Sequence, residues 1–215
     1  MNYFEHDLQS FAVNFSQNPK QNQKRRVIVL AGPDRVGKTT FASKLEHALK
    51  LEGLHTKYIH FSAPDKELQQ DCGYQYQYTD LFTDHQGKEV LVLDRSWICG
   101  LVYDVCRRDR ELNINSLLTL ERWIANQSIE VTVLVVYADW FKVKYDHEEE
   151  LEAGISPVSS IEQARDEHFD YYRIVRLYAE RSSLKFGTVN RSQVKSSNIK
   201  GVACPKYSIT QGLTW

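Results

Sequence analysis

Residues 27–49, with the sequence VIVLAGPDRVGKTTFASKLEHAL, carry the clearest structural pattern in the chain. The first five residues are a continuous apolar run rich in β-branched side chains, which is typical of a strand covered on both faces. The last residues place Phe41, Leu45 and Leu49 on one face of a helix. The glycine-rich turn between them fits the pattern GxxxxGK[ST]. The pattern therefore predicts a strand, a phosphate-binding loop and a helix in that order.

The chemistry of this loop assigns roles to its residues. Glycines let the chain curl so that consecutive backbone N–H groups point inward, and the helix N-terminus adds a partial positive charge. Lys38 is expected to reach the β and γ phosphates of a bound ATP, and the Thr39 hydroxyl is expected to bind Mg²⁺. The predicted phosphate-binding residues are Gly32, Val36, Gly37, Lys38, Thr39 and Thr40.

Two charged residues lie inside the loop. An acid beside a polyphosphate is costly unless it faces another group, so Asp34 is expected to face a sugar hydroxyl. Arg35 is expected to lie across the phosphates and to neutralise charge in the transition state. The alternative for both residues is a solvated charged turn.

The rest of the chain alternates between strand and helix patterns. Further strands are expected at 57–61, 90–93, 131–137 and 184–189, and further helices at 97–108, 114–126 and 160–182. This alternation predicts an α/β fold with three layers, a parallel five-stranded sheet with helices on both faces. In such sheets ligands bind at the carboxyl ends of the strands.

The outer segments are interpreted as additions to one domain. Residues 1–24 are expected to form an accessory helix and a linker, and residues 25–190 the main domain, with a lid near 143–157. The tail, 191–215, is polar and is expected to hold one helix at most. Within the lid, the acidic run at 147–150 is interpreted as solvated.

The composition of the chain limits the kinds of partner and compartment that we expect. The chain has 215 residues with 27 basic and 28 acidic side chains, so it lacks the basic excess usual in nucleic-acid-binding proteins. No apolar run is long enough for a membrane span, and no signal peptide is visible at the start. The four cysteines are far apart and form no CxxC pair, so we expect free thiols in the cytoplasm.

Residues 27–49 resemble the start of thymidylate kinases, in the type that has Asp-Arg inside the loop. A second match is VLVLDRSWICGLVYD at 90–104, where the family has Asp-Arg at a strand end and an aromatic residue nine positions after the Asp. The corresponding residues here are Asp94, Arg95 and Tyr103. The resemblance implies the P-loop kinase fold, and the departures below suit a viral or phage member.

The resemblance also implies roles for these residues. Asp34 would hold the 3′-hydroxyl of the acceptor sugar, and Tyr103 would pack under the deoxyribose. Asp94 would hold Mg²⁺ through water or position the acceptor phosphate, and Arg95 would clamp that phosphate. The catalytic residues are then Lys38, Arg35, Asp94 and Arg95, the acceptor-binding residues are Asp34, Arg95, Tyr103 and Phe61, and the metal ligands are Thr39 and Asp94. Apart from the resemblance, the tyrosines at 74, 76 and 78 alternate, and one of them, with Tyr74 chosen, is expected to stack on the acceptor base, the alternative being ordinary packing or surface tyrosines.

The chain departs from the family pattern in three places. Ser96 replaces the tyrosine after Asp-Arg, and the segment after Phe61 has no arginine, with Lys66 as a substitute at best. The lid near 143–157 is acidic and also lacks arginine, which agrees with Arg35 as the catalytic cation.

The resemblance implies Mg²⁺-assisted transfer of phosphate from ATP to a deoxynucleoside 5′-monophosphate, with dTMP favoured. One alternative is a deoxynucleoside kinase, although no glutamate follows Phe61 directly to serve as a base. Another is a P-loop regulatory protein that binds nucleotides without catalysis. The expected partners are small-molecule nucleotides, with no nucleic acid and no membrane, and a homodimer stays open.

Overall fold

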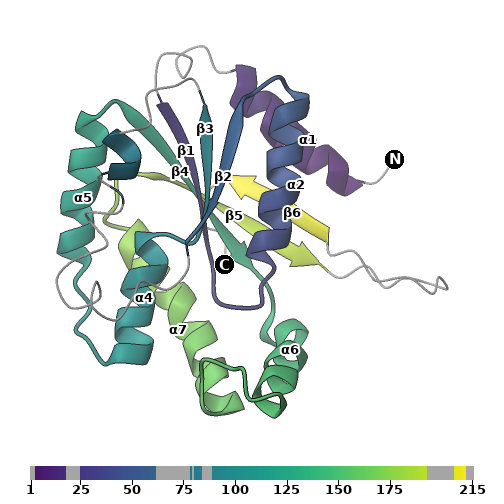
Figure 1. Ribbon diagram of the computed structural model, residues 1–215, viewed down its shortest axis with the longest axis vertical. Helices are drawn as coiled ribbons and strands as arrows, with labels where there is room; N and C mark the ends of the chain where they lie inside the picture. Colours follow the sequence, from purple (N-terminus) through teal and green to yellow (C-terminus); the bar gives the residue numbers. More distant parts are fainter. Residues whose placement is uncertain are drawn as a thin grey trace.

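The computed structural model describes residues 3–17, 25–61, 78, 80–83, 89–192 and 206–211. Strands and helices alternate through most of this part of the chain (Figure 1). In order they are α1 (Tyr3–Gln17), β1 (Arg25–Ala31), α2 (Lys38–Leu51), β2 (Thr56–His60), β3 (Val90–Asp94), α4 (Trp97–Arg108), α5 (Ile114–Asn126), β4 (Ile129–Tyr137), α6 (Trp140–Glu152), α7 (Ile161–Ala179), β5 (Lys185–Ser192) and β6 (Lys206–Gln211).

The strands form one sheet in the order β2-β3-β1-β4-β5-β6. The first five strands are all parallel to one another, which confirms the predicted parallel sheet. The sixth, β6, pairs with β5 in the antiparallel direction. A helix at most was expected for the tail, and this expectation is wrong because part of the tail forms β6. The pairing satisfies backbone groups of β5 that would otherwise lie at an open sheet edge.

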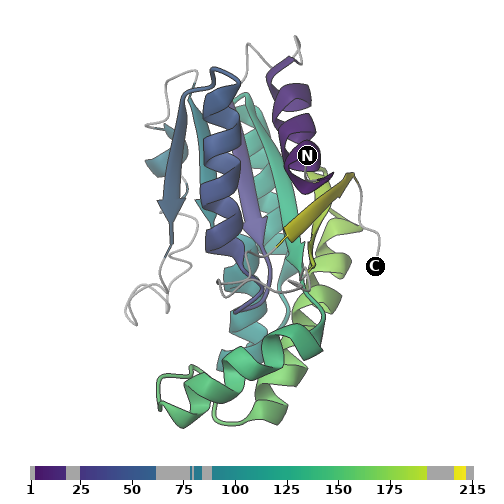
Figure 2. The ribbon, with the colours of Figure 1, turned by 90° about the vertical axis from the view of Figure 1, so that its right-hand side faces the viewer.

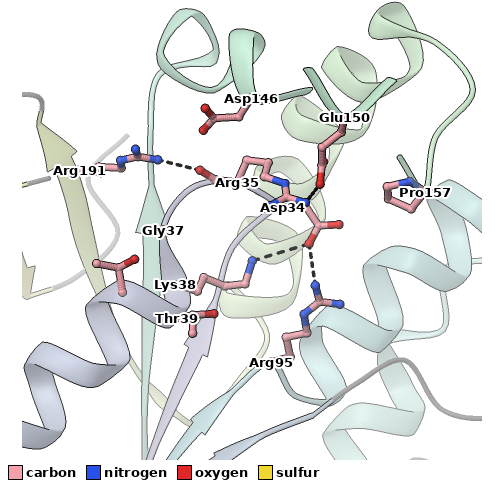
Figure 3. A pocket seen from close by; sticks show the side chains of 11 residues that line it. Asp34, Arg35, Gly37, Lys38, Thr39, Arg95, Asp146, Glu150, Pro157 and Arg191 are labelled. Carbon is pink, nitrogen blue, oxygen red and sulfur yellow. Dashed lines mark hydrogen bonds and ion pairs between the residues drawn. The ribbon is translucent and has the colours of Figure 1, made fainter. Parts of the chain in front are cut away.

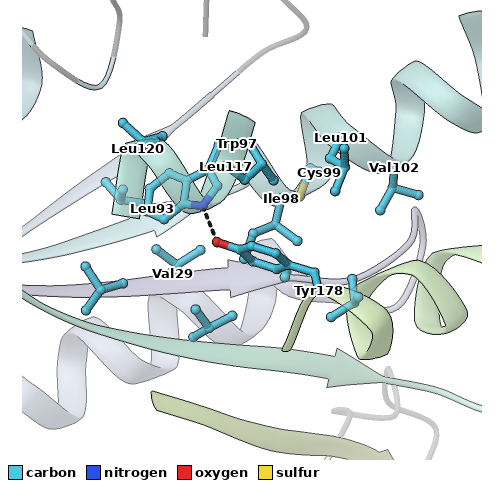
Figure 4. Packing of buried hydrophobic residues seen from close by; sticks show 14 of the residues in the cluster. Val29, Leu93, Trp97, Ile98, Cys99, Leu101, Val102, Leu117, Leu120 and Tyr178 are labelled. Carbon is cyan, nitrogen blue, oxygen red and sulfur yellow. Dashed lines mark hydrogen bonds between the residues drawn. The ribbon is translucent and has the colours of Figure 1, made fainter. Parts of the chain in front are cut away.

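Helices cover both faces of the sheet (Figure 2). The strands are apolar throughout because both faces are buried: in β1, Val27 and Val29 pack with α4, α5 and α7, whereas Ile28 and Leu30 pack with α1, α2 and α6. On the first face the Trp97 indole N–H of α4 donates to the Tyr178 hydroxyl of α7 at 3.2 Å (Figure 4). This contact fixes α4 against α7, and both helices carry residues of the site described below.

The strand order places the site. The neighbours of β1 are β3 on one side and β4 on the other, so the chain order reverses at β1, where open α/β sheets have a crevice for ligands. The register pairs Leu30 of β1 with Asp94 of β3. The loop after β1 therefore lies next to the acid that ends β3. No helix in the described part of the chain is long and apolar enough to span a membrane.

Candidate active site

The loop after β1 has the backbone geometry that its glycines permit. Gly32 has φ 153°, and a Cβ there would lie 2.6 Å from the Val136 carbonyl oxygen. Gly37 has φ 87° and forms the N-cap of α2 without a side-chain capping bond. The N-terminus of α2 therefore begins at the loop with no side chain of its own capping it, as anion-binding helices do.

A cavity of about 420 Å³ opens on this loop (Figure 3). Three of its cations are predicted site residues, Arg35, Lys38 and Arg95, and Arg191 at the end of β5 is a fourth. Gly32 and Val36 are not among the lining residues. The lining is completed by Asp34, Gly37, Thr39, Thr40, Asp146, Glu150 and Pro157.

Lys38 is buried, with 6% of its side chain exposed. Its Nζ donates to the Pro33 carbonyl oxygen at 2.6 Å and lies 4.0 Å from Asp34 Oδ1. Burial lowers the pKa of Lys38, and the nearby charge of Asp34 partly opposes this. A phosphate group that enters the cavity would add a second, closer negative charge and would stabilise the charged form of the lysine.

Asp94 is almost fully buried, and one of its two oxygens receives three polar contacts. Oδ2 accepts from the Thr39 hydroxyl at 2.7 Å and from the Tyr58 hydroxyl at 2.9 Å, and it lies 2.9 Å from His60 Nδ1. Oδ1 has no hydrogen-bond partner among the described residues. Burial raises the pKa of Asp94, but the hydrogen bonds outweigh this and leave it below its usual value.

Thr39 and Asp94 together are suited to bind a magnesium ion. A buried carboxylate oxygen without a partner is costly unless a cation or a metal-bound water meets it. Thr39 and Asp94 are in direct contact, as expected for residues that share one ion. The described residues contain no cluster of three or more His, Cys, Asp and Glu side chains that could hold a metal, so the remaining ligands would be nucleotide phosphate and water.

The Asp34 carboxylate has hydrogen-bond partners on both of its oxygens. Oδ1 accepts from Arg95 Nη2 at 3.1 Å and from the Tyr103 hydroxyl at 3.0 Å, and Oδ2 accepts from Arg107 Nη2 at 2.8 Å. Burial raises the pKa of Asp34, but the surrounding cations outweigh burial and hold it well below its usual range. The structure thus brings three predicted acceptor-site residues together.

Arg107 belongs to the cluster Arg107, Arg108 and Arg110, for which the sequence favours a solvated face, with contact to a phosphate as the alternative. It does not line the cavity, but it contacts Asp34, which does. Its Nε and Nη2 contact the two carboxylate oxygens of Glu167 on α7, at 2.6 and 2.5 Å. Its guanidinium lies 3.9 Å from the centroid of the Tyr103 ring. The available signal was the four-residue spacing from Tyr103, which puts both side chains on one face of α4.

Arg35 has φ 67°, a conformation that is uncommon for a residue with a side chain. Its guanidinium forms an ion pair with Glu150 of α6, and its carbonyl oxygen accepts from Arg191 Nη1 at 2.7 Å. The prediction that 147–150 is solvated is wrong for His147 and Glu150, which are 5% and 8% exposed. His147 is buried because its ring stacks on Trp140 at 5.6 Å.

Phe61, a predicted acceptor-binding residue, does not line the cavity. It packs against Tyr78 with ring centroids 5.1 Å apart, at the edge of the core. Tyr74 and Lys66 lie outside the described residues. Ser96 caps α4 by accepting from the Ile98 N–H at 3.2 Å, so its hydroxyl orders the helix that carries Tyr103 and Arg107.

No protein-family model and no curated protein matches this chain. Solved structures are similar at low identity. Polyphosphate kinase 2 from Arthrobacter aurescens TC1 matches with a TM-score of 0.55 and 16% identity over 84% of this chain and 65% of its own. A Pseudomonas aeruginosa PA01 protein provisionally assigned as polyphosphate kinase 2 matches with a TM-score of 0.60 and 17% identity, over 87% of this chain and 42% of its own. YorR from Bacillus subtilis, in complex with phosphorylated GDP, matches with a TM-score of 0.54 and 21% identity, over 75% of this chain and 84% of its own.

These similarities confirm the predicted fold, the three-layer α/β fold of P-loop kinases. The chain spans only 65% and 42% of the two structures assigned to polyphosphate kinase 2. At these identities the likeness concerns the fold, so the reaction must be argued from the side chains.

Proposed function

We propose that this chain is a phosphotransferase that moves the γ-phosphate of ATP to a deoxynucleoside 5′-monophosphate, with dTMP as the preferred acceptor. The observation that carries the proposal is that two cationic groups suited to phosphate lie on either side of one carboxylate. Lys38 of the loop is 4.0 Å from Asp34 Oδ1, and Arg95 Nη2 is 3.1 Å from the same oxygen. The loop is the group for the donor phosphates and Arg95 is the group for the acceptor phosphate. Donor and acceptor phosphates bound to these groups would be neighbours.

The chain's own residues supply positioning and charge. Lys38 and Arg35 would neutralise charge that develops as the phosphoryl group passes between oxygens, and Arg95 would orient the acceptor phosphate. The acceptor oxygen belongs to an ionised phosphate, so the reaction needs no strong general base. When bound by Thr39 and Asp94, Mg²⁺ would neutralise negative charge on the β and γ phosphates.

Closure of the site involves α6. Asp146, Glu150 and Pro157 line the cavity from α6 and the turn after it. This supports the lid near 143–157, which would exclude water and limit ATP hydrolysis. Glu150 holds Arg35 in the present structure, so the phosphates of ATP would compete with Glu150 for that guanidinium.

One observation favours a second candidate, a deoxynucleoside kinase. Transfer to a hydroxyl needs a base, and His60 at the end of β2 lies 2.9 Å from Asp94 Oδ2 through its Nδ1. A histidine oriented by a carboxylate is a common general base. In this candidate Nε2 of His60 would accept the proton of a 5′-hydroxyl.

A matrix of donors and acceptors tests the proposal. The purified chain is assayed with ATP, GTP and inorganic polyphosphate as donors, the last because two neighbours are named polyphosphate kinases. The acceptors are all deoxy- and ribonucleoside monophosphates and all nucleosides, with products separated by chromatography. Formation of dTDP from ATP and dTMP at the highest kcat/KM supports the proposal. Formation of monophosphates from nucleosides supports the second candidate, and nucleotide binding without product supports a regulatory protein.

A further inference from the structure

We propose that Arg107, with Arg95 and the Tyr103 hydroxyl, forms the binding site for the acceptor's phosphate, and that the Asp34 carboxylate occupies this site when no acceptor is bound. The inference rests on the proposed function, because it assigns a site to that reaction's acceptor. It selects Arg107 from the cluster Arg107, Arg108 and Arg110 as the phosphate ligand, and it adds Asp34 as the group that fills the site when the acceptor is absent.

The first argument is the convergence of donors on one anion. Groups from three residues of β3's end and α4 meet the two oxygens of Asp34 at 2.8 to 3.1 Å. Carboxylate and phosphate oxygens are bound by the same donors, and arginine forks suit both. A set of donors that encloses a carboxylate in this way is therefore also a site for a phosphate group.

The second argument is that Arg107 is held in place without Asp34. Glu167 binds it through two hydrogen bonds, and the Tyr103 ring supports its flat face at 3.9 Å. The helices beneath are joined by the bond between Trp97 and Tyr178. Arg107 would keep its position when Asp34 turns away, which is the preorganisation that a binding site needs.

The third argument is charge and spare capacity. The cluster contains three cations, Lys38, Arg95 and Arg107, and three anions, Asp34, Glu167 and Asp94, the last of which interacts electrostatically with Lys38 and Arg95. When Asp34 turns away, three cations and two anions are left, so a phosphate that takes its place would meet an excess of positive charge. Within the described part of the chain, Arg107 donates hydrogen bonds from Nε and Nη2 and none from Nη1. An incoming phosphate therefore finds both charge and donors.

The test is calorimetric titration of dTMP into the full chain saturated with Mg²⁺ and a non-hydrolysable ATP analogue. Arg107→Gln is expected to weaken dTMP binding about 10- to 100-fold and to change analogue affinity by less than about 2-fold. Arg107→Lys keeps the charge without the fork and should give an intermediate loss, which also covers the case in which the Gln variant does not fold. Arg110→Gln is the matched control, because Arg110 lies just beyond the same helix and is 41% exposed.

A second titration separates anion binding from a merely structural role of Arg107. Inorganic phosphate is titrated into the analogue-saturated protein, so that the loop is already filled. Asp34→Asn should bind phosphate about 10-fold more tightly than the wild type, because the internal competitor is gone. Adding Arg107→Gln to that variant should abolish the gain. A structural role for Arg107 would produce neither change.

The outcomes distinguish this inference from the proposed function. Wild-type dTMP affinity in folded Arg107→Gln or Arg107→Lys, or an unchanged phosphate affinity in Asp34→Asn, overturns the inference and leaves the function standing. Arg107-dependent dTMP binding without turnover supports the inference and overturns the function. A wild-type chain that binds no monophosphate at all overturns both.

Discussion

Two acids lie near Lys38, the largely buried Asp34 and the fully buried Asp94, and they differ in how completely their oxygens are used. Asp34 has partners on both oxygens, two of them arginines. Asp94 has three polar contacts on one oxygen and none on the other among the described residues. The first acid is already neutralised by the protein. The second is left incomplete, and an incomplete buried carboxylate is suited to a cation that arrives with the substrate.

The surroundings of the two acids also differ in the kind of contact they provide. The Asp34 side ties the loop to the end of β3 and to α4 and α7 through charged contacts. The Asp94 side is built from β2, β3 and the first turn of α2, and its donors are mostly neutral. We therefore expect substitutions on the Asp94 side to act on metal dependence and those on the Asp34 side to act on stability and acceptor binding.

Lys38→Ala removes the cation shared by both sides and should have the largest effect. Phosphate transfer is expected to fall by at least about 10³-fold, because the buried ammonium of Lys38 is expected to neutralise the β and γ phosphates and Arg35 cannot replace it from its position beside Glu150. The measurement is product formation from ATP and dTMP, with circular dichroism to show that the fold is kept. Lys50→Ala, an exposed position on the same helix, is the control. Full activity in Lys38→Ala would contradict the loop assignment.

Arg35→Ala tests a cation that contacts neither acid and pairs with Glu150 instead. The expected result is a loss in kcat of about 10³-fold with ATP affinity changed by less than about 3-fold, as for an arginine that acts mainly in the transition state. Steady-state kinetics and calorimetry measure the two quantities separately. Arg165→Ala, on the exposed face of α7, serves as the control. An unchanged kcat would show that Arg35 is a charged residue of a solvated turn without a catalytic role.

Asp94→Asn sharpens the comparison directly. Asparagine keeps the contacts to Oδ2 but removes the charge facing the proposed ion, so we expect half-saturation by Mg²⁺ to rise by about 10- to 100-fold. Asp34→Asn is expected to leave the Mg²⁺ dependence unchanged. Activity is titrated against Mg²⁺ at saturating ATP, and Mg²⁺-dependent binding of the ATP analogue gives an independent reading. Equal increases in the half-saturating Mg²⁺ concentration in the two variants would show that Mg²⁺ binding does not depend on Asp94 more than on Asp34.

The sequence predicted the parts of the site that are local in the chain. The loop and its helix are contiguous, and their glycine positions determine the backbone shape directly. Asp94 and Arg95 could be placed because the carboxyl end of a buried strand next to β1 has one position in this kind of sheet. The same logic gave the five parallel strands.

The contacts that complete the site could not be predicted in this way. Arg107 and Glu167 are 60 residues apart in the sequence and meet only because α4 and α7 pack side by side. His147 and Glu150 occur in an acidic run that indicates a solvated surface, yet the packing of α6 buries them. Such pairings depend on how helices are rotated against the sheet, and a single sequence carries little information on that rotation.

The last prediction concerns the acid dependence of stability, where the two acids should again differ. The pKa of Asp34 is held below its usual range, so its ion pairs contribute stability that is fully present above about pH 4 and is lost as the pH falls through the pKa of the folded state. Asp34→Asn should therefore be less stable by about 2–4 kcal/mol at pH 7, because two arginines lose their buried partner. Its stability should also fall less between pH 5 and pH 2 than that of the wild type.

Urea denaturation of the wild type, Asp34→Asn and Asp94→Asn at a series of pH values measures this difference. The Asp94 carboxylate is stabilised mainly by hydrogen bonds, several of them from neutral donors. Asp94→Asn should therefore lower the free energy of unfolding by less than Asp34→Asn does, and should reduce its dependence on acidic pH by less. Asp170→Asn, on the exposed surface of α7, controls for the loss of a charge as such. If the Asp34→Asn curve runs parallel to the wild-type curve, the ion pairs around Asp34 do not stabilise the fold. The contrast between a neutralised acid and an incomplete one would then rest on metal dependence alone.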